Sequence, residues 1–212
     1  MTRVVSAAIA TWCSTACGHH EAPVSCDADG SDQAALYQHA VQLIDAHMIL
    51  ADRAATARND RDVRSGVACF DQLLALAPTN WQAWWLRGKG LQALGDHSRA
   101  VASFREAYRI QPASVDVGRE LEAELLEVRG FAEAATVARA MSTMVPANAG
   151  LQANLAVALA LNGQLSEARQ TVAAALRLDP NDEITKALAR RLDEIANGTR
   201  QMPSSLDELQ RR

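Results

Sequence analysis

The stretch NWQAWWLRGKGLQALGDHSRAVASFREAYRIQP, residues 80–112, contains two runs of helix-forming residues separated by a Leu-Gly-Asp corner. In the second run Ala100, Phe104 and Ala107 are spaced by four and three residues, which places them on one face of a helix ending near Pro112. Gly95 can adopt the left-handed conformation that closes the first run. The stretch therefore predicts two helices joined by a tight turn.

The same unit recurs along the chain with a 34-residue period. Prolines mark the period, at Pro78, Pro112, Pro146 and Pro180. Twelve positions before each proline stands a small residue, and these are Gly66, Ala100, Ala134 and Ala168. Eight positions before each proline stands an apolar residue, and these are Phe70, Phe104, Ala138 and Val172. The period predicts an array of helix pairs.

The composition agrees with an all-α fold. The chain has 212 residues, of which 49% are hydrophobic with much alanine, and only three Phe, four Trp and two Tyr. Alanine-rich, glycine-poor sequences favour helix. No segment alternates apolar and polar residues at the two-residue period of a half-buried strand. We therefore expect no sheet.

The periodic pattern closely resembles the tetratricopeptide repeat, whose unit carries W-x2-L-G-x2-Y, then A-x3-F, then P. In residues 80–112 the matching positions are Trp84, Gly88, Leu91, Gly95, Ala100, Phe104, Ala107 and Pro112. A second strong copy, residues 149–182, supplies Leu155, Ala156, Leu159, Gly163, Ala168, Val172, Ala175 and Pro180. The resemblance implies a right-handed α-solenoid in which the first helix of each unit lines a concave groove.

The period also sets the expected boundaries. We predict a signal sequence over 1–16, a flexible tether over 17–31, a long helix with a degenerate first repeat over 32–80, repeats over 81–114, 115–148 and 149–182, a capping helix over 183–197 and a tail over 198–212. The degenerate repeat has ARNDRD, residues 57–62, where the corner glycine is expected. In the tail, Ser205 and Glu208 form a capping box, so the tail is either a frayed terminal helix or a detachable segment.

Two positions of the 115–148 copy depart from the pattern. Glu122 stands where a small residue lets the paired helices touch, and Gly130 comes one residue later than the corner glycines of the other copies. We expect looser packing or a local shift in this repeat.

The amino terminus has the three parts of a secretory signal: a basic start, an uncharged stretch from Val4 to Ala16, and small residues before a cleavage site. The sequence STAC, residues 14–17, resembles a bacterial lipobox, in which Cys17 would be lipidated, although Ser14 stands where leucine is usual. Ordinary cleavage before Cys17 with soluble export is one alternative, and an uncleaved cytoplasmic arm is another.

Cys13, Cys17, His19, His20 and Cys26 form a cluster that offers thiolate and imidazole, the ligands that zinc prefers. Their spacing matches no strong zinc pattern and is not a haem-attachment motif. A metal-binding secreted protein is therefore an alternative only, and no metal or cofactor is predicted. Cys69 lies on an apolar helix face and is expected to be a small buried hydrophobic residue.

The residues predicted to line the groove follow from the 34-residue register, and they are Gln82, Trp85, Lys89, Gln92, Asp116, Arg119, Ala123, Ala153 and Val157. Adjacent helical residues point about 100° apart, so Trp84 and Trp85 cannot both be core residues. Trp84 matches the core position. Trp85 is then either an exposed anchor for a bound chain or a residue packed on the preceding unit.

The sequence contains no phosphate loop, no G-x-S-x-G and no H-E-x-x-H motif, so we expect no catalysis. The net charge of −4 has no basic cluster, which excludes nucleic acid as an expected partner. We predict a non-catalytic adaptor of the cell envelope that binds a segment of another protein and meets the membrane only through its lipid. A self-associating structural repeat protein is the alternative.

Overall fold

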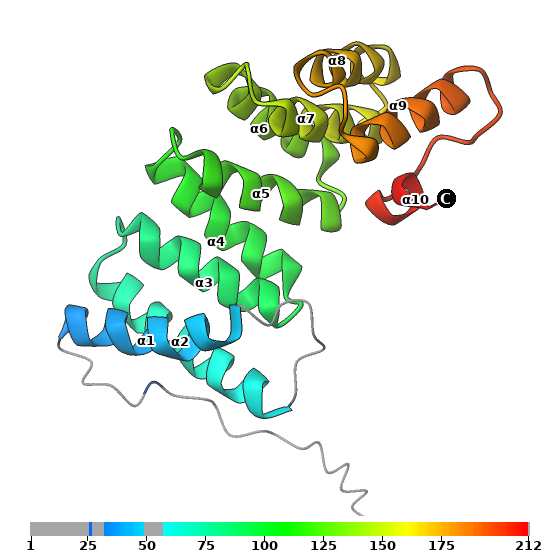
Figure 1. Ribbon diagram of the computed structural model, residues 1–212. Helices are drawn as coiled ribbons and strands as arrows, with labels where there is room; N and C mark the ends of the chain where they lie inside the picture. The colour runs from blue at the N-terminus through cyan, green and yellow to red at the C-terminus, as the bar shows by residue number, and fades with distance from the viewer. Residues whose placement is uncertain (1–25, 27–31, 49–56, 212) are drawn as a thin grey trace, which may run out of the picture.

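The computed structural model describes residue 26 and residues 32–48 and 57–211. The regular elements in these ranges are all α-helices (Figure 1). In chain order they are α1 (Gln33–Met48), α2 (Ala57–Leu76), α3 (Trp81–Ala93), α4 (His97–Ile110), α5 (Val115–Glu127), α6 (Phe131–Met144), α7 (Ala149–Leu161), α8 (Leu165–Leu178), α9 (Glu183–Ala196) and α10 (Leu206–Gln210).

Successive helices pack as pairs, α1 with α2, α3 with α4, α5 with α6 and α7 with α8, and each pair stacks on the next. Figure 1 shows the pairs following one another in a curved array, with α9 covering the last pair. The apolar residues of the repeat register form the core, and Ala100, Phe104 and Ala168 are fully buried. The expected all-α solenoid is confirmed.

Small residues stand where the two helices of a pair come close together. A Cβ atom added to Gly66 would lie 2.7 Å from Cγ1 of Ile44 on α1, and one added to Gly88 would lie 2.5 Å from the ring of Phe104 on α4. Either contact would push the paired helices apart. The small residues of the sequence pattern are therefore a packing requirement.

The corners of the array use left-handed backbone at one register position. Gly95 has φ of 71° and Gly163 has φ of 79°. In the repeat between them this position is Arg129, with φ of 61°, while Gly130 has φ of −76° and is the N-cap of α6. Gly130 therefore does not close α5, and the local shift expected from its late position is absent at this corner because Arg129 adopts the left-handed conformation instead.

Polar side chains begin most of the helices. Each of these residues accepts a hydrogen bond from a backbone N–H in the first turn: Asn80 before α3, Asp96 before α4, Ser114 before α5, Asn148 before α7 and Asp182 before α9. Such caps satisfy N–H groups that have no partner inside the helix. They therefore stabilise the first turns of these helices.

The degenerate first pair differs from the sequence expectation at its corner. Residues 57–62 belong to the first turns of α2, so they do not replace the missing corner glycine. The connection between α1 and α2 lies instead within 49–56, outside the described residues. Among the helices that the structure describes, none is long and apolar enough to cross a bilayer.

Candidate functional site

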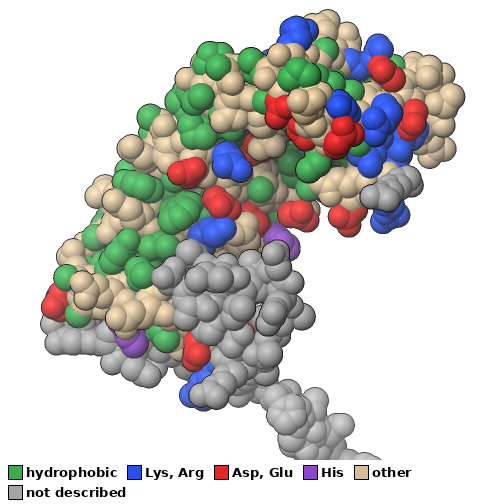
Figure 2. All heavy atoms as spheres, viewed as in Figure 1, with side chains coloured by type: hydrophobic (Ala, Val, Ile, Leu, Met, Phe, Trp, Pro, Cys, Tyr) green, Lys and Arg blue, Asp and Glu red, His purple; other side chains and the backbone are tan. Residues whose placement is uncertain are grey.

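The outward sides of α3, α5 and α7 form one surface, which we call the first-helix face. The predicted groove residues all lie on these helices. Gln82, Asp116, Arg119 and Ala123 are exposed, whereas Trp85, Lys89, Gln92, Ala153 and Val157 are half-buried. Figure 2 shows basic and acidic side chains mixed over the middle of the molecule, so this view presents no patch of a single charge.

A polar network joins α3 to α5 on this face. Lys89 Nζ donates to Gln92 Oε1 at 2.6 Å and to Glu120 Oε1 at 3.1 Å. Gln92 Nε2 donates to Glu120 Oε2 at 3.3 Å and to Glu124 Oε1 at 2.8 Å. Two of the predicted groove residues are therefore held by carboxylates of the next repeat, which fixes their side chains before any partner arrives.

His97, at the start of α4, extends the network, because its Nδ1 lies 2.9 Å from Glu124 Oε2. The Glu124 side chain is 3% exposed, while that of His97 is 44% exposed. Sequence reasoning missed Glu120, Glu124 and His97. A signal was present for Glu124, because its register position holds Gly90 in the preceding repeat and Ala158 in the next.

The two adjacent tryptophans of α3 are both half-buried and pack against the hydrophobic core. Trp84 Nε1 donates to the Pro78 carbonyl at 2.9 Å, and the Arg87 guanidinium carbon lies 5.8 Å from the Trp84 ring centroid. The Nε1 atom of Trp85 is buried and has no hydrogen-bond partner among the described residues. The Trp85 ring therefore packs against the core, while its Nε1–H donor makes no hydrogen bond with the described residues.

Glu122 is a buried carboxyl group in α5. It is 2% exposed, and its Oε2 has no hydrogen-bond partner in the part of the chain that the structure describes. Burial raises the pKa of Glu122 to about 7, although a hydrogen bond with Asn154 on α7 and the charge of Arg119 act in the opposite direction. The α5–α6 pair is packed less extensively than α3–α4 or α7–α8, which agrees with the looser packing expected for this repeat.

The tail folds back onto α7. Pro203 and Leu209 are buried, and Leu209 belongs to the hydrophobic core. The cap of α10 differs in one bond from the expected capping box. Ser205 Oγ accepts from the Glu208 N–H at 3.2 Å, but the Glu208 carboxylate accepts from the Ser204 N–H at 2.7 Å. The tail does form a terminal helix, but this helix is packed against α7 and is not frayed as predicted.

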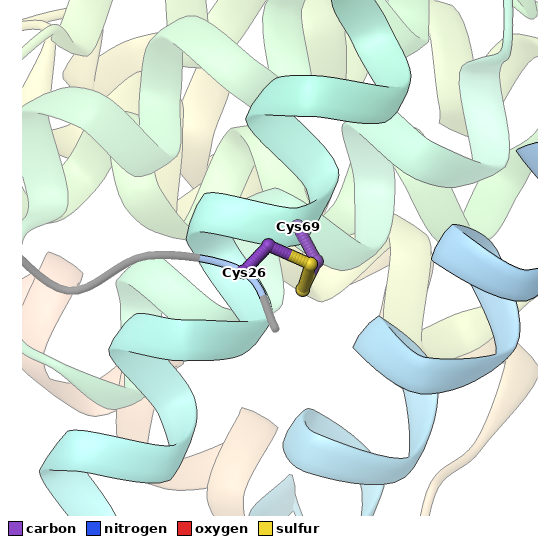
Figure 3. The surroundings of a disulfide bond; sticks show 2 residues. All are labelled: Cys26 and Cys69. Atoms are coloured by element: carbon purple, nitrogen blue, oxygen red, sulfur yellow. A yellow bond between two sulfur atoms is a disulfide. The ribbon is translucent and has the colours of Figure 1, made fainter. Parts of the chain in front are cut away.

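A disulfide joins Cys26 to Cys69, with the Cα atoms 4.8 Å apart and a sequence separation of 43 residues. Figure 3 shows that Cys69 lies on α2 and Cys26 on the segment that precedes α1. Cys69 is fully buried as expected, but it is not a free thiol, because its sulfur is bonded to that of Cys26. Cys26 is also not a free thiolate for the metal-binding alternative. Cys13, Cys17, His19 and His20 lie outside the described residues.

Two family models, both described as tetratricopeptide repeat, match the sequence. One covers residues 51–115 and the other residues 125–192, so together they span more than half of the chain. The chain is a tetratricopeptide-repeat protein. This repeat is a non-catalytic protein-interaction module, and the segment between the two matches is most of α5, which carries Glu120, Glu122 and Glu124.

The fold is similar to solved structures of other proteins. MamA from Desulfovibrio magneticus RS-1, residues 41 to the end, is 19% identical with a TM-score of 0.57, over 74% of this chain and 86% of that chain. YrrB, described as a TPR protein with an unusual peptide-binding site, is 17% identical with a TM-score of 0.59, over 80% of this chain and 82% of that chain. At these identities the likeness shows the fold alone. A comparison with curated proteins gave no significant match.

Proposed function

We propose that this protein is an exported scaffold that holds a segment of a partner protein on its first-helix face, as part of the assembly of a cell-envelope structure. The observation that carries the export is the Cys26–Cys69 disulfide. Disulfides persist in oxidising compartments and are rare in reducing cytosol. The disulfide therefore favours the two exported alternatives over a cytoplasmic arm.

The membrane tether is the finer part of the proposal. STAC at 14–17 supplies the lipidation motif, and a diacylated Cys17 would anchor the chain stably. Eight residues then lie between Cys17 and Cys26. Lipidation and the disulfide are compatible, because each uses a different cysteine.

Intact-mass measurement after membrane fractionation tests whether the protein is exported and lipidated. The full gene is expressed in a bacterial host, and both fractions are measured without reductant. We expect a diacylated species that begins at Cys17 in the membrane pellet. A soluble species that begins at Cys17 would reject the lipid but keep the export. A soluble species that still begins at Met1 or Thr2 would reject both.

Site-specific photocrosslinking tests the binding surface. Arg119 is exposed on α5, in the first-helix face, whereas Ala102 is exposed on α4, the second helix of its pair. A photoreactive residue at Arg119 should give a defined crosslinked partner that is absent when the probe is at Ala102. The Trp85→Ala substitution should reduce this crosslink. Equal crosslinking from both probes would argue against the first-helix face as the binding surface.

Self-association through α9 is a second candidate, because Ile184 of the capping helix is 82% exposed. This side chain would be buried if a second copy packed against α9. Light scattering over a range of concentrations tests this candidate. A dimer that Ile184→Asp converts to a monomer would support it, and a monomer at all concentrations would reject it.

A further inference from the structure

The tail, residues 199–211, begins with Thr199 and Arg200, whose backbone N–H groups both donate to the Glu194 carbonyl of α9, at 2.9 and 3.1 Å. α9 ends at Asn197 and Gly198, where Gly198 has φ of 80° and reverses the chain. Residues 196–202 are exposed apart from Arg200, which is half-buried. α10 itself has five residues, too few to be stable as an isolated helix. Beyond this hydrogen-bonded start, residues 201 and 202 are exposed, so the rest of the tail is held mainly by Pro203 and by what α10 contacts.

The tail lies against α7, one of the helices of the first-helix face. Leu161, at the carboxyl end of α7, is 6% exposed. The same register position holds Glu127 in the preceding repeat, which is exposed, and Ala93 in α3, which is half-buried. The carboxyl end of α7 thus has a buried apolar residue where the corresponding end of α5 has an exposed charged one. Both α9 and α10 contact α7.

Arginines of the body complement the acidic α10. Arg191 on α9 donates from Nη2 to the carbonyl oxygen of Gln210 at 3.0 Å, at the negative end of the α10 dipole. Hydrogen bonds from Ser204 hold the pKa of Glu208 below its ordinary value, and the charges of Arg211 and Arg129 act in the same direction. In Figure 2 basic and acidic side chains gather together at the right of the molecule, where α9 and α10 lie.

We propose that the surface of α7 beneath α10 is a binding site for a short acidic helix of a partner protein, and that the chain's own tail occupies this site until the partner displaces it. The inference rests on the proposed function, since α7 belongs to the first-helix face. The tail defines the ligand chemistry: a serine cap, two leucines three residues apart, and two carboxylates between them, as in SSLDEL at 204–209. Leu209 is the buried anchor, the charge of Arg129 acts on Glu208, and Arg191 donates to the Gln210 carbonyl.

The test adds the tail back as a separate molecule. The probe is a fluorescent peptide of residues 202–211, and the proteins are the full wild-type chain and its Leu209→Asp variant. The substitution removes the anchor from the tail but leaves α7 and α9 unchanged. Anisotropy should show binding to the variant and at least about tenfold weaker binding to wild type, because an occupied site binds only in the fraction of molecules that is open.

Two controls keep the test decisive. The same peptide carrying Leu209→Asp should bind neither protein. Pro203→Glu removes the other buried residue of the tail and should reproduce the effect, so the test stands even if Leu209→Asp fails to fold. Both variants should also be cleaved faster by trypsin after Arg200, which reports release of the tail independently of the peptide.

Equal peptide binding to wild type and to both variants, or no binding to variants whose tail trypsin shows to be released, would overturn the proposal. A wild-type dimer that Leu209→Asp converts to a monomer would also overturn it, because the site would then hold the tail of a second copy. These failures are distinct from failure of the proposed function, since the crosslink at Arg119 reports on α5 and does not involve the tail.

Discussion

Glu122 should make the stability of the protein fall as the pH rises. Its pKa is about 7 in the folded chain and 4.5 when unperturbed, so between these values the folded state holds a proton that the unfolded state has lost. The free energy of unfolding should therefore be highest below pH 4.5 with respect to this group, decrease through pH 7, and then level off. A shift of this size corresponds to about 3 kcal/mol.

Glu122→Gln removes the titration while keeping the shape of the side chain. Urea unfolding of the full chain with its disulfide intact is measured at pH 5 and at pH 8, for wild type and variant. The variant should gain up to about 3 kcal/mol relative to wild type between these conditions. Glu127→Gln, an exposed site on the same helix, makes the same change in charge and should show no such gain. A difference between Glu122→Gln and wild type that is the same at both pH values would refute the reasoning.

Three further changes test other parts of the structure. Arg129→Gly should stabilise the protein by about 1 kcal/mol, because glycine carries no penalty at positive φ; Arg129→Ala, which keeps the penalty, should show no such gain in thermal unfolding. Gly88→Ala should destabilise it by about 1–3 kcal/mol, since the new Cβ would lie 2.5 Å from the Phe104 ring; an unchanged unfolding midpoint would contradict this close approach. Reduction should cost about 4 kcal/mol, as a loop of 43 residues is released; chemical denaturation with and without reductant measures this loss, and a chain with both Cys26→Ser and Cys69→Ala should not respond to the reductant.

The sequence was sufficient for the repeat architecture because each unit repeats the same local requirements. These requirements lie within one helix pair: a small residue such as Ala100 or Ala168, a ring or β-branched side chain four residues later, and a proline at the end. Local periodicity reports such constraints directly. In the 115–148 repeat the late position of Gly130 was misleading. The backbone kept the register of the other corners, so Arg129 adopts the left-handed conformation.

The candidate site was less accessible from the sequence because its contacts join residues far apart in the chain. The register placed Lys89 and Gln92 on the first-helix face, but their partners Glu120 and Glu124 come from the next repeat. The position of the tail depends on tertiary contacts with α7, which no pattern within SSLDEL contains. The Cys26–Cys69 pairing likewise joins a segment outside the repeats to α2, and cysteine spacing alone does not determine connectivity.

The disulfide also limits how far the folded array can lie from a lipid on Cys17. If Cys17 carries the lipid, eight residues lie between it and Cys26, and even fully extended this segment spans only about 30 Å. Because Cys69 lies in the middle of α2, the first helix pair would be held close to the membrane. The first helix pair would then be the part of the array nearest to the lipid, with α9 and α10 at the opposite end of the array (Figure 1).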